Sequence, residues 1–367
     1  MNSGLEIKTV NKSFAEIRAV RGLSLDVGPG EIIALTGPSG AGKTTTCRLV
    51  AGLEKPDTGT VHINGRNIAN LTPQMRDVSM MFESYALYPL MSVAENIAFA
   101  LHAPARKGRY RESDIEKRVE DVLDLTELSS FRDRMPHELS GGQKQRVALC
   151  RALAQSPSTY LLDEPIAHLD AKLRHKLRGE LRRRLTSSGV PTVWCTPDAM
   201  EALSVADRVA VLTEGRLRQL DTLEAIFSRP RHIDVARLIG DPAINLLSGS
   251  LRRADGSLAF VNDVITLQLP DKTRQRLESS DVDGKVVLGV RPTDIEIAEN
   301  GAERAVIGEV YTLEPFGKYA ILAMRLGTDI VKAKIFRPLQ ANTGDIVSIR
   351  FREVDYVVFD AATGEAI

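Results

Sequence analysis

The stretch over residues 37–45 constrains this chain more than any other. It reads Gly-Pro-Ser-Gly-Ala-Gly-Lys-Thr-Thr and fits the phosphate-loop pattern G-x-x-x-x-G-K-[ST]. An apolar run over 32–35 precedes it and a helix-compatible run over 45–51 follows, which is the strand–loop–helix setting that the pattern requires. The glycines let backbone N–H groups turn toward a phosphate chain, and the helix N-terminus adds the positive end of its dipole. A chance glycine turn is the alternative, but the preceding strand argues against it. The stretch predicts binding of a nucleoside triphosphate.

Within this loop, we expect Lys43 to reach the terminal phosphates and the Thr44 hydroxyl to bind Mg²⁺. The residues predicted to bind the nucleotide are Gly37, Pro38, Ser39, Gly40, Ala41, Gly42, Lys43, Thr44 and Thr45.

A short apolar strand over 160–162 ends in Asp163-Glu164 and is expected to join the same site. Asp163, at the end of the strand, can hold Mg²⁺ directly or through water. Glu164 can polarise an attacking water and is the predicted catalytic residue. Phosphoryl transfer needs mainly positioning, a metal ion and charge compensation, so these groups are sufficient for that chemistry. An Asp-Glu pair after a strand is common, and it gains meaning only from the phosphate loop.

A second glycine-rich turn opens a helix at Leu139, Ser140, Gly141, Gly142 and Gln143. Such a turn is also an anion site of the phosphate type. One chain with one nucleotide needs no second site, but a head-to-tail dimer does. Each nucleotide would then lie between one chain's phosphate loop and the other chain's turn. A plain helix start remains the alternative for any Ser-Gly-Gly.

Length and charge limit the classes of function. The chain has 367 residues, which favours two domains, and its 48 Lys+Arg balance 48 Asp+Glu, which gives no indication of nucleic-acid binding. The three cysteines lie far apart without metal-ligand spacing and are expected to be reduced, mostly buried thiols: Cys47, Cys150 and Cys195. We expect neither a signal peptide nor a membrane span, because no long uncharged apolar run occurs.

The order of the predicted elements indicates the fold class. Strands and helices alternate through the first part, which favours a parallel sheet with helices on both sides and a small antiparallel layer against it. The run 5–10 is typical of an edge strand, and a helical subdomain is expected over about 87–150. We interpret Asp241-Pro242 and Ser248-Gly249 as turns. The short strands that follow them predict a small β-barrel or a pair of barrels. The predicted domains are 1–238, an α/β nucleotide-binding domain, and 239–367, an all-β domain.

Taken together, three motifs resemble the ATPase subunits of ABC transporters. They are the phosphate loop, the turn at 139–143 with the helix that continues it, and the run Leu-Leu-Asp-Glu-Pro at 161–165. The loop Ser-Tyr-Ala-Leu-Tyr-Pro at 84–89 is similar to the one that faces the membrane subunits in that family. The runs 288–292 and 359–364 resemble the C-terminal OB-type (TOBE) barrel of the carbohydrate-importer branch.

This resemblance implies ATP and Mg²⁺ as cofactors and adds two site residues. Phe14 would stack on adenine, although a merely packed aromatic is possible, and Asp170 would be the aspartate of the dimer-contact loop. It also implies the partners: a second ATPase subunit, two transmembrane permease subunits and a periplasmic or extracellular substrate-binding protein. The chain would lie peripherally on the cytoplasmic face of a bacterial inner membrane.

Two positions depart from the family pattern. Glu83 stands where the membrane-facing loop usually begins with Gln, and Pro197 stands where the family has a switch His before Asp198. Proline has no titratable group and no backbone N–H, so it cannot contact a γ-phosphate as His does. Glu83 would keep a Mg²⁺ ligand, but when ionised it cannot donate a hydrogen bond to water. His168, where the family more often has Asn, could in principle replace the switch residue, but a harmless substitution is the simpler interpretation.

These departures predict a degenerate ATP site in an asymmetric heterodimer. The chain would energise import of a sugar or a polyol, with glycerol as a candidate cargo. The alternative is a nucleotide-gated regulatory clamp without useful hydrolysis. A soluble ABC protein of DNA repair or translation is disfavoured, because such proteins usually carry two cassettes or long coiled coils.

Overall fold

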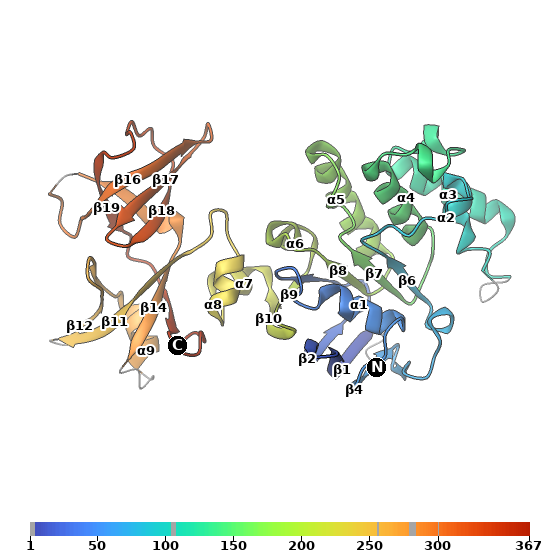
Figure 1. Cartoon of the computed structure of the whole chain (residues 1–367), viewed down its shortest axis with the longest axis horizontal. Helices are drawn as coiled ribbons and strands as arrows, with labels where there is room; N and C mark the ends of the chain where they lie inside the picture. Colours follow the sequence, from blue (N-terminus) through green and yellow to red (C-terminus); the bar gives the residue numbers. More distant parts are fainter. Residues whose placement is uncertain (1–3, 104–107, 255–256, 279–283, 300) are drawn as a thin grey trace. The chain divides into compact units, whose positions relative to one another are not determined.

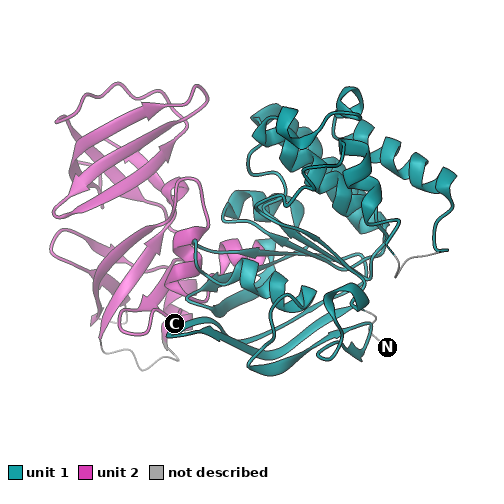
Figure 2. Cartoon of the chain, turned by 45° about the vertical axis from the view of Figure 1, so that its right-hand side comes forward, with its two compact units in different colours: residues 1–223 teal, residues 224–367 magenta. Residues whose placement is uncertain are grey.

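The chain divides into two compact units, residues 1–223 and 224–367 (Figures 1 and 2). The computed structural model describes residues 4–103, 108–254, 257–278, 284–299 and 301–367. The division falls before the boundary predicted near Leu238, because the intervening segment bonds to the end of the chain. The N–H of Ile233 donates to the carbonyl of Gly364 at 2.8 Å, and that of Ala366 to the carbonyl of Arg231 at 2.9 Å.

The first unit is built on a six-stranded sheet in the order β10-β9-β3-β8-β7-β6. The five strands from β9 to β6 run parallel, and β10 pairs antiparallel with β9. In chain order the strands are β3 (Ile32–Thr36), β6 (Val78–Met81), β7 (Thr159–Asp163), β8 (Thr192–Cys195), β9 (Arg208–Thr213) and β10 (Arg216–Thr222). The parallel core predicted from the alternation of strands and helices is confirmed.

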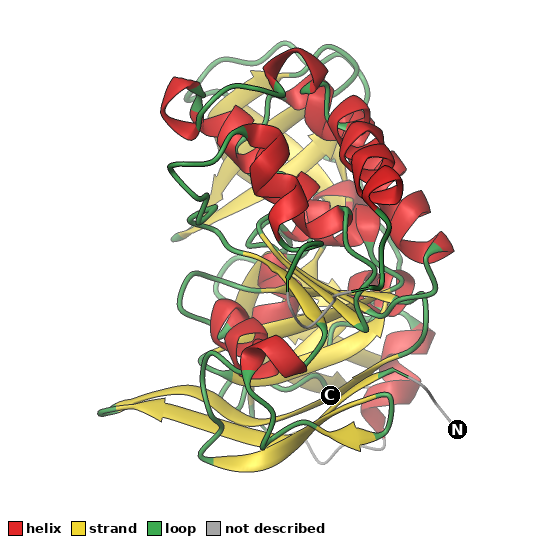
Figure 3. Ribbon diagram, turned by 90° about the vertical axis from the view of Figure 1, so that its right-hand side faces the viewer, coloured by secondary structure: helices red, strands yellow, loops and turns green. Residues whose placement is uncertain are grey.

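Both faces of this sheet are covered, as β8 illustrates (Figure 3). Trp194 points to one face and bonds to Glu201 of α6 (Ala199–Val205), and α5 (Ala171–Ser187) lies on that face too. Cys195 points to the other face, where its Sγ lies 3.3 Å from that of Cys47 in α1 (Lys43–Ala51). All three cysteines are buried and free, as predicted.

A smaller antiparallel sheet packs against α1, in the order β2-β1-β4-β5. Its strands are β1 (Leu5–Phe14), β2 (Ile17–Val27), β4 (Thr58–Ile63) and β5 (Arg66–Asn67). The interpretation of 5–10 as an edge strand is wrong, because β1 pairs with β2 on one side and β4 on the other. Alternation of apolar and polar residues indicates that one face of a strand is buried. It does not indicate how many strands pair with that strand. The helical insertion contains α2 (Val93–Phe99), α3 (Glu112–Leu125) and α4 (Gly141–Leu153).

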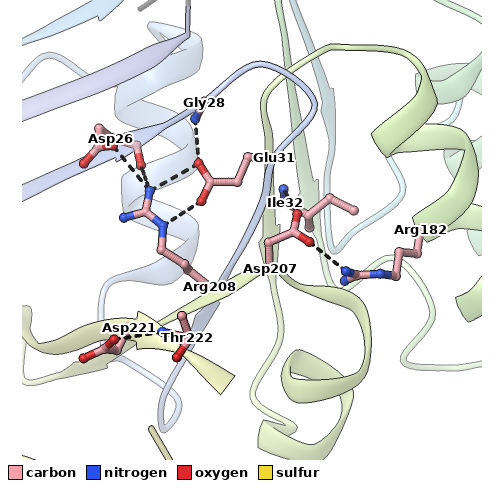
Figure 4. A network of polar contacts seen from close by, with 9 residues as sticks. All are labelled: Asp26, Gly28, Glu31, Ile32, Arg182, Asp207, Arg208, Asp221 and Thr222. Carbon is pink, nitrogen blue, oxygen red and sulfur yellow. Dashed lines mark hydrogen bonds and ion pairs between the residues drawn. The ribbon is translucent and has the colours of Figure 1, made fainter. Parts of the chain in front are cut away.

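Charged residues fix the amino ends of β3 and β9 (Figure 4). The Arg208 guanidinium donates from Nε to Oε1 of Glu31 at 2.6 Å. Asp207 accepts from the Ile32 N–H at 2.9 Å through one oxygen and from Arg182 of α5 at 2.7 Å through the other. These bonds lie at the opposite end of the strands from the phosphate loop, so they hold the register without occupying the site.

The second unit contains two five-stranded sheets that share one apolar core. The first has the order β13-β12-β11-β14-β20 and the second β15-β19-β16-β17-β18. Their strands are β11 (Asn245–Ala254), β12 (Ser257–Val261), β13 (Thr266–Gln268), β14 (Lys285–Val290), β15 (Ile295–Ala298), β16 (Val306–Pro315), β17 (Ala320–Leu326), β18 (Asp329–Ile335), β19 (Ile346–Phe351) and β20 (Val357–Asp360).

This unit departs from an all-β design in three short helices. They are α7 (Leu223–Ser228), which begins at the unit boundary, α8 (Ile233–Leu238) and α9 (Asp271–Glu278). The sequence predicts a turn at Ser248-Gly249, but these residues lie inside β11. A Cβ at Gly249 would come within 2.5 Å of the Phe260 ring, so this glycine serves close packing. Among the described residues, no helix combines the length and the apolar character needed to cross a membrane.

Candidate functional site

Four loops that carry predicted site residues leave the sheet at one edge. Strands β6, β7, β8 and β3 are neighbours and run parallel, so their carboxyl ends lie together. The phosphate loop follows β3, Glu83 follows β6, Glu164 follows β7 and Pro197 follows β8. Sheet topology therefore brings together residues that the sequence separates widely.

The phosphate loop requires its first glycine. Gly37 has a φ of 148°, and a Cβ there would lie 2.0 Å from the carbonyl oxygen of Leu212 on β9. Lys43 is buried, and its ammonium donates to the carbonyls of Gly37 at 2.7 Å and Pro38 at 3.0 Å. Burial lowers the pKa of Lys43, and Cys195 and the neighbouring carboxylates oppose that effect. The side chain thus already lies along the loop that is expected to hold phosphates.

Asp163 is the most unusual group of the site. Its side chain is 1% exposed, and neither carboxylate oxygen has a hydrogen-bond partner among the described residues. Burial raises the pKa of Asp163 to about 6; Glu83 and Glu164 raise it as well, whereas Thr44 and Lys43 lower it. A buried carboxylate without partners is costly unless a cation neutralises it.

This arrangement fits a Mg²⁺ ion. Hard oxygen ligands suit Mg²⁺, which usually takes one or two protein groups and fills its other positions with water and substrate phosphates. Asp163 supplies two oxygens without partners, and the Thr44 hydroxyl is near enough to influence its pKa. Among the described residues, no three His, Cys, Asp or Glu side chains are arranged so that they could hold a metal ion together.

Glu164 lies in a strained turn at the end of β7. Its φ is 51°, a region that residues other than glycine seldom adopt. Two hydrogen bonds hold it: its N–H donates to the carbonyl of Cys195 at 2.9 Å, and its carbonyl accepts from Gln145 Nε2 at 2.8 Å. Glu83 is exposed in the loop after β6, and its charge acts on Asp163 and Lys43. The three predicted carboxylates therefore share one electrostatic environment.

The loop after β8 presents no donor at the position of the family's switch residue. Pro197 is exposed there, and its ring nitrogen carries no hydrogen. The next residue, Asp198, accepts from the N–H groups of Met200 at 2.8 Å and Glu201 at 3.1 Å, and so caps α6. Its carboxylate is engaged in this cap rather than pointing freely into the site.

The turn at 139–143 caps a helix. Ser140 Oγ accepts from the Gln143 N–H at 3.3 Å, and the Gln143 side chain accepts from the Ser140 N–H at 2.7 Å, which forms a capping box at the start of α4. Asp170 likewise caps α5 by accepting from the Leu173 N–H at 3.0 Å. Both residues have a structural role in the isolated chain, in addition to any role toward a second subunit.

Phe14 ends β1 on the hairpin that passes the phosphate loop. A Cβ at Gly42 would lie 2.5 Å from the carbonyl of Ala19 on β2, so the hairpin backbone touches this loop. The Phe14 ring is 41% exposed and lies 5.0 Å from the Lys12 ammonium. A partly exposed ring at this place is available for stacking, which stays a prediction.

Sequence reasoning missed two residues that organise these loops. Gln145 and Arg151 lie on α4 and are largely buried, at 0% and 9% exposure. Gln145 bonds to Glu164 and to the backbone of His168, and Arg151 bonds to the backbone of Tyr85 and Ala86. The signal was a polar side chain on the apolar face of a predicted helix, where burial demands a partner.

Comparisons with known proteins agree with this architecture. Residues 20–167 match the family "ABC transporter", and residues 240–295 match the family "MalK OB fold domain". The trehalose/maltose import ATP-binding protein MalK of Thermococcus litoralis is 37% identical, with 100% of each chain covered. The sn-glycerol-3-phosphate import ATP-binding protein UgpC 3 of Agrobacterium fabrum is 36% identical, with 98% of each covered.

A solved structure supports the first unit. A dimeric ATP-binding cassette in a post-hydrolysis state, bound to ADP and phosphate, is 30% identical with a TM-score of 0.56. It covers 60% of this chain, and the match includes 98% of the cassette. The predicted fold class, an ABC-type α/β unit followed by a unit of the OB type, is confirmed. The chain belongs to the ATP-binding subunits of ABC transporters, in the branch that carries a MalK-type OB fold domain.

Proposed function

We propose that this chain is the ATP-binding subunit of an importer in which its own ATP turns over slowly. In this proposal it completes the working site of a second, different ATPase subunit. The proposal rests on a contrast between two sets of motifs in this chain. The phosphate loop and the turn at 139–143 are complete, whereas Pro197 stands at the switch position after β8.

In this proposal Pro197 removes a hydrogen-bond donor, and the next residue in the chain does not replace it. A switch histidine would offer a ring N–H toward a γ-phosphate, and proline offers none. Asp198 is engaged in capping α6. Glu83 adds negative charge where the family has an uncharged donor, beside Asp163, whose pKa is already raised. Loss of such positioning groups typically lowers a rate by about 10²–10⁴-fold.

Binding of ATP does not depend on the lost groups. Lys43, Thr44 and the amides at the start of α1 are present, and Asp163 with Thr44 would hold Mg²⁺, which compensates phosphate charge when bound. Glu164 would orient the attacking water, but without a donor at position 197 the γ-phosphate lacks one hydrogen bond. Slow hydrolysis with retained binding is the expected result.

The assembly and the cargo are inferred from relatives. Proteins covering nearly the whole chain are named as import subunits for trehalose/maltose and sn-glycerol-3-phosphate. A sugar or a polyol, with glycerol as a candidate, is the cargo we propose. The partners would be two membrane permease subunits, a substrate-binding protein and the second ATPase, with this chain peripheral on the cytoplasmic face of the membrane.

Two measurements test the proposal. Tagged chain purified from detergent-solubilised host membranes should carry along two membrane subunits and a different ATPase. The isolated chain should bind ATP·Mg²⁺ but release phosphate far more slowly than that complex. Co-purification of a soluble regulatory protein without membrane subunits would instead favour a regulatory clamp. Rapid phosphate release by the isolated chain would contradict the degenerate site.

A further inference from the structure

Helix α4 holds the turn that follows β7. Gln145, which is fully buried, donates from Nε2 to the carbonyl of Glu164 at 2.8 Å. Its Oε1 accepts from the His168 N–H at 3.0 Å. At the start of the same helix, a Cβ at Gly142 would come within 3.2 Å of the His168 carbonyl. The start of α4 and the turn 164–170 therefore move together or break these contacts.

The same helix also holds the loop that follows β6. Arg151 donates from Nη2 to the carbonyl of Tyr85 at 2.7 Å and from Nη1 to that of Ala86 at 2.8 Å. Tyr85 and Ala86 have φ values of 64° and 45°, a conformation unfavourable for residues with a Cβ. The two bonds from a largely buried guanidinium keep the loop in this conformation.

A direct contact closes the ring between the two loops. The Tyr85 hydroxyl lies 3.0 Å from Nδ1 of His168, within hydrogen-bond distance, and the rings meet edge to face with centroids 6.2 Å apart. Each loop is thus bonded to α4 and to the other loop. A continuous ring of contacts of this kind offers a route by which a displacement of one loop can reach the other.

We propose that His168 is a positioning residue that ties the loop 83–90 to the turn 164–170. The inference rests on the proposed function: when a second subunit's ATP approaches the start of α4, the tie makes the loop 83–90 follow. Alanine at this position would remove Nδ1 and leave the Tyr85 hydroxyl without this contact. His168 thereby adds a link that does not depend on the missing switch histidine.

Hydrogen exchange of the isolated full chain tests the tie itself. His168→Ala should speed exchange in the segment 83–90, and Tyr85→Phe should speed it in the segment 164–170, each by about fivefold. The double variant should resemble either single variant, because all three remove the same bond. His175→Ala, at an exposed position of α5, is the matched control and should change neither segment. Changes confined to the substituted segment, or additive changes, would overturn the proposal.

Hydrogen exchange in the purified membrane complex tests whether the tie between the two loops acts when ATP binds. ATP·Mg²⁺ should slow exchange in both segments of the wild-type chain. In the His168→Ala complex it should still protect 164–170 but no longer 83–90. Protection of 83–90 that persists in that variant would also overturn the proposal, because a merely structural histidine leaves the ATP response intact. Failure to recover any membrane complex would refute the proposed function, while the isolated chain would still decide whether the tie exists.

Discussion

The indole Nε1 of Trp194 donates a hydrogen bond of 2.8 Å to Oε1 of Glu201. Trp194 is 0% exposed and Glu201 3%, and they lie on β8 and on α6, to either side of Pro197 in the sequence. The bond therefore anchors the loop in which Pro197 replaces the switch histidine of the family. Burial raises the pKa of Glu201; Asp198 adds to the shift, and the bond to Trp194 opposes it.

The raised pKa predicts a particular dependence of stability on pH. A carboxyl whose pKa is raised in the folded state costs no stability below its ordinary pKa and an increasing amount as pH rises through the folded value. Glu201→Gln keeps an acceptor for Trp194 and removes this cost. We expect the variant to melt at a higher temperature than the wild type at pH 8 and at nearly the same temperature at pH 4.5.

The matched control is Glu201→Leu, which leaves the buried Trp194 N–H without an acceptor. Compared with Glu201→Gln, it should lower the free energy of unfolding by about 1–3 kcal/mol at every pH. Calorimetric melts of the three proteins across this range provide the measurement. A Glu201→Gln protein that is less stable than the wild type at pH 8 would show that the ionised carboxylate is favourable there.

The degenerate site predicts a gain of function. Glu83→Gln together with Pro197→His should raise phosphate release by the isolated chain more than the two single changes added together, because both residues would act on one γ-phosphate. Binding of ATP·Mg²⁺ should change little. Steady-state phosphate release under saturating ATP is the measurement, and single variants that already restore the full rate would argue against a shared role.

The local motifs allowed the centre of the first unit to be predicted from the sequence. Phosphate loop, preceding strand and following helix are contiguous, so their geometry follows from the nearby sequence. The run 160–162 was placed correctly as a buried strand, β7, because a short apolar run before a polar pair has few other interpretations. Parallel pairing then brings Asp163 to the edge of the sheet that also bears the phosphate loop.

Features that depend on distant contacts were not predictable in this way. Gly249 was interpreted as part of a turn, but it packs against Phe260, which only the folded sheet reveals. The left-handed conformation of Tyr85 and Ala86 depends on Arg151, more than sixty residues away in the sequence. The sequence does not predict the strands β11, β12, β13 and β18, because alternation of apolar and polar residues in a short segment is a weak signal without knowledge of its pairing partners.

The division of the chain predicts which fragment folds. Residues 1–223 contain the whole sheet and the phosphate loop, and we expect this fragment to keep ATP affinity within about threefold, since no predicted nucleotide ligand lies beyond it. A fragment ending at Leu238 should bind equally well but expose the apolar residues of α8, which otherwise pack on the second unit. Fluorescent-nucleotide binding and dye binding to exposed apolar surface distinguish the two fragments. A folded fragment 1–223 that fails to bind ATP would refute the predicted ligand set.

The asymmetric dimer makes the sharpest prediction: in the assembled transporter, the turn at 139–143 and the chain's own ATP site should contribute unequally to ATP turnover. If the second subunit's ATP is the one that turns over, phosphate access to this chain's turn at 139–143 should matter more than its own Glu164. Ser140→Arg places a bulky cation where a phosphate must approach the helix N-terminus, and it should abolish ATPase activity of the complex. Ser140→Ala is the matched control: it loses the cap of α4, at a cost of about 1 kcal/mol, but leaves the amides accessible and should keep most of the activity.

Glu164→Gln completes the comparison. It removes the predicted base from a site that already lacks its switch group, so the ATPase rate of the reconstituted complex should fall little. The equivalent change in the other ATPase should cost about 10²–10⁴-fold, because there the glutamate would act together with an intact switch residue. Measuring both complexes under the same conditions decides between the models. Equal losses from the two substitutions would mean two working sites, and Pro197 would then have to be compatible with turnover in this chain.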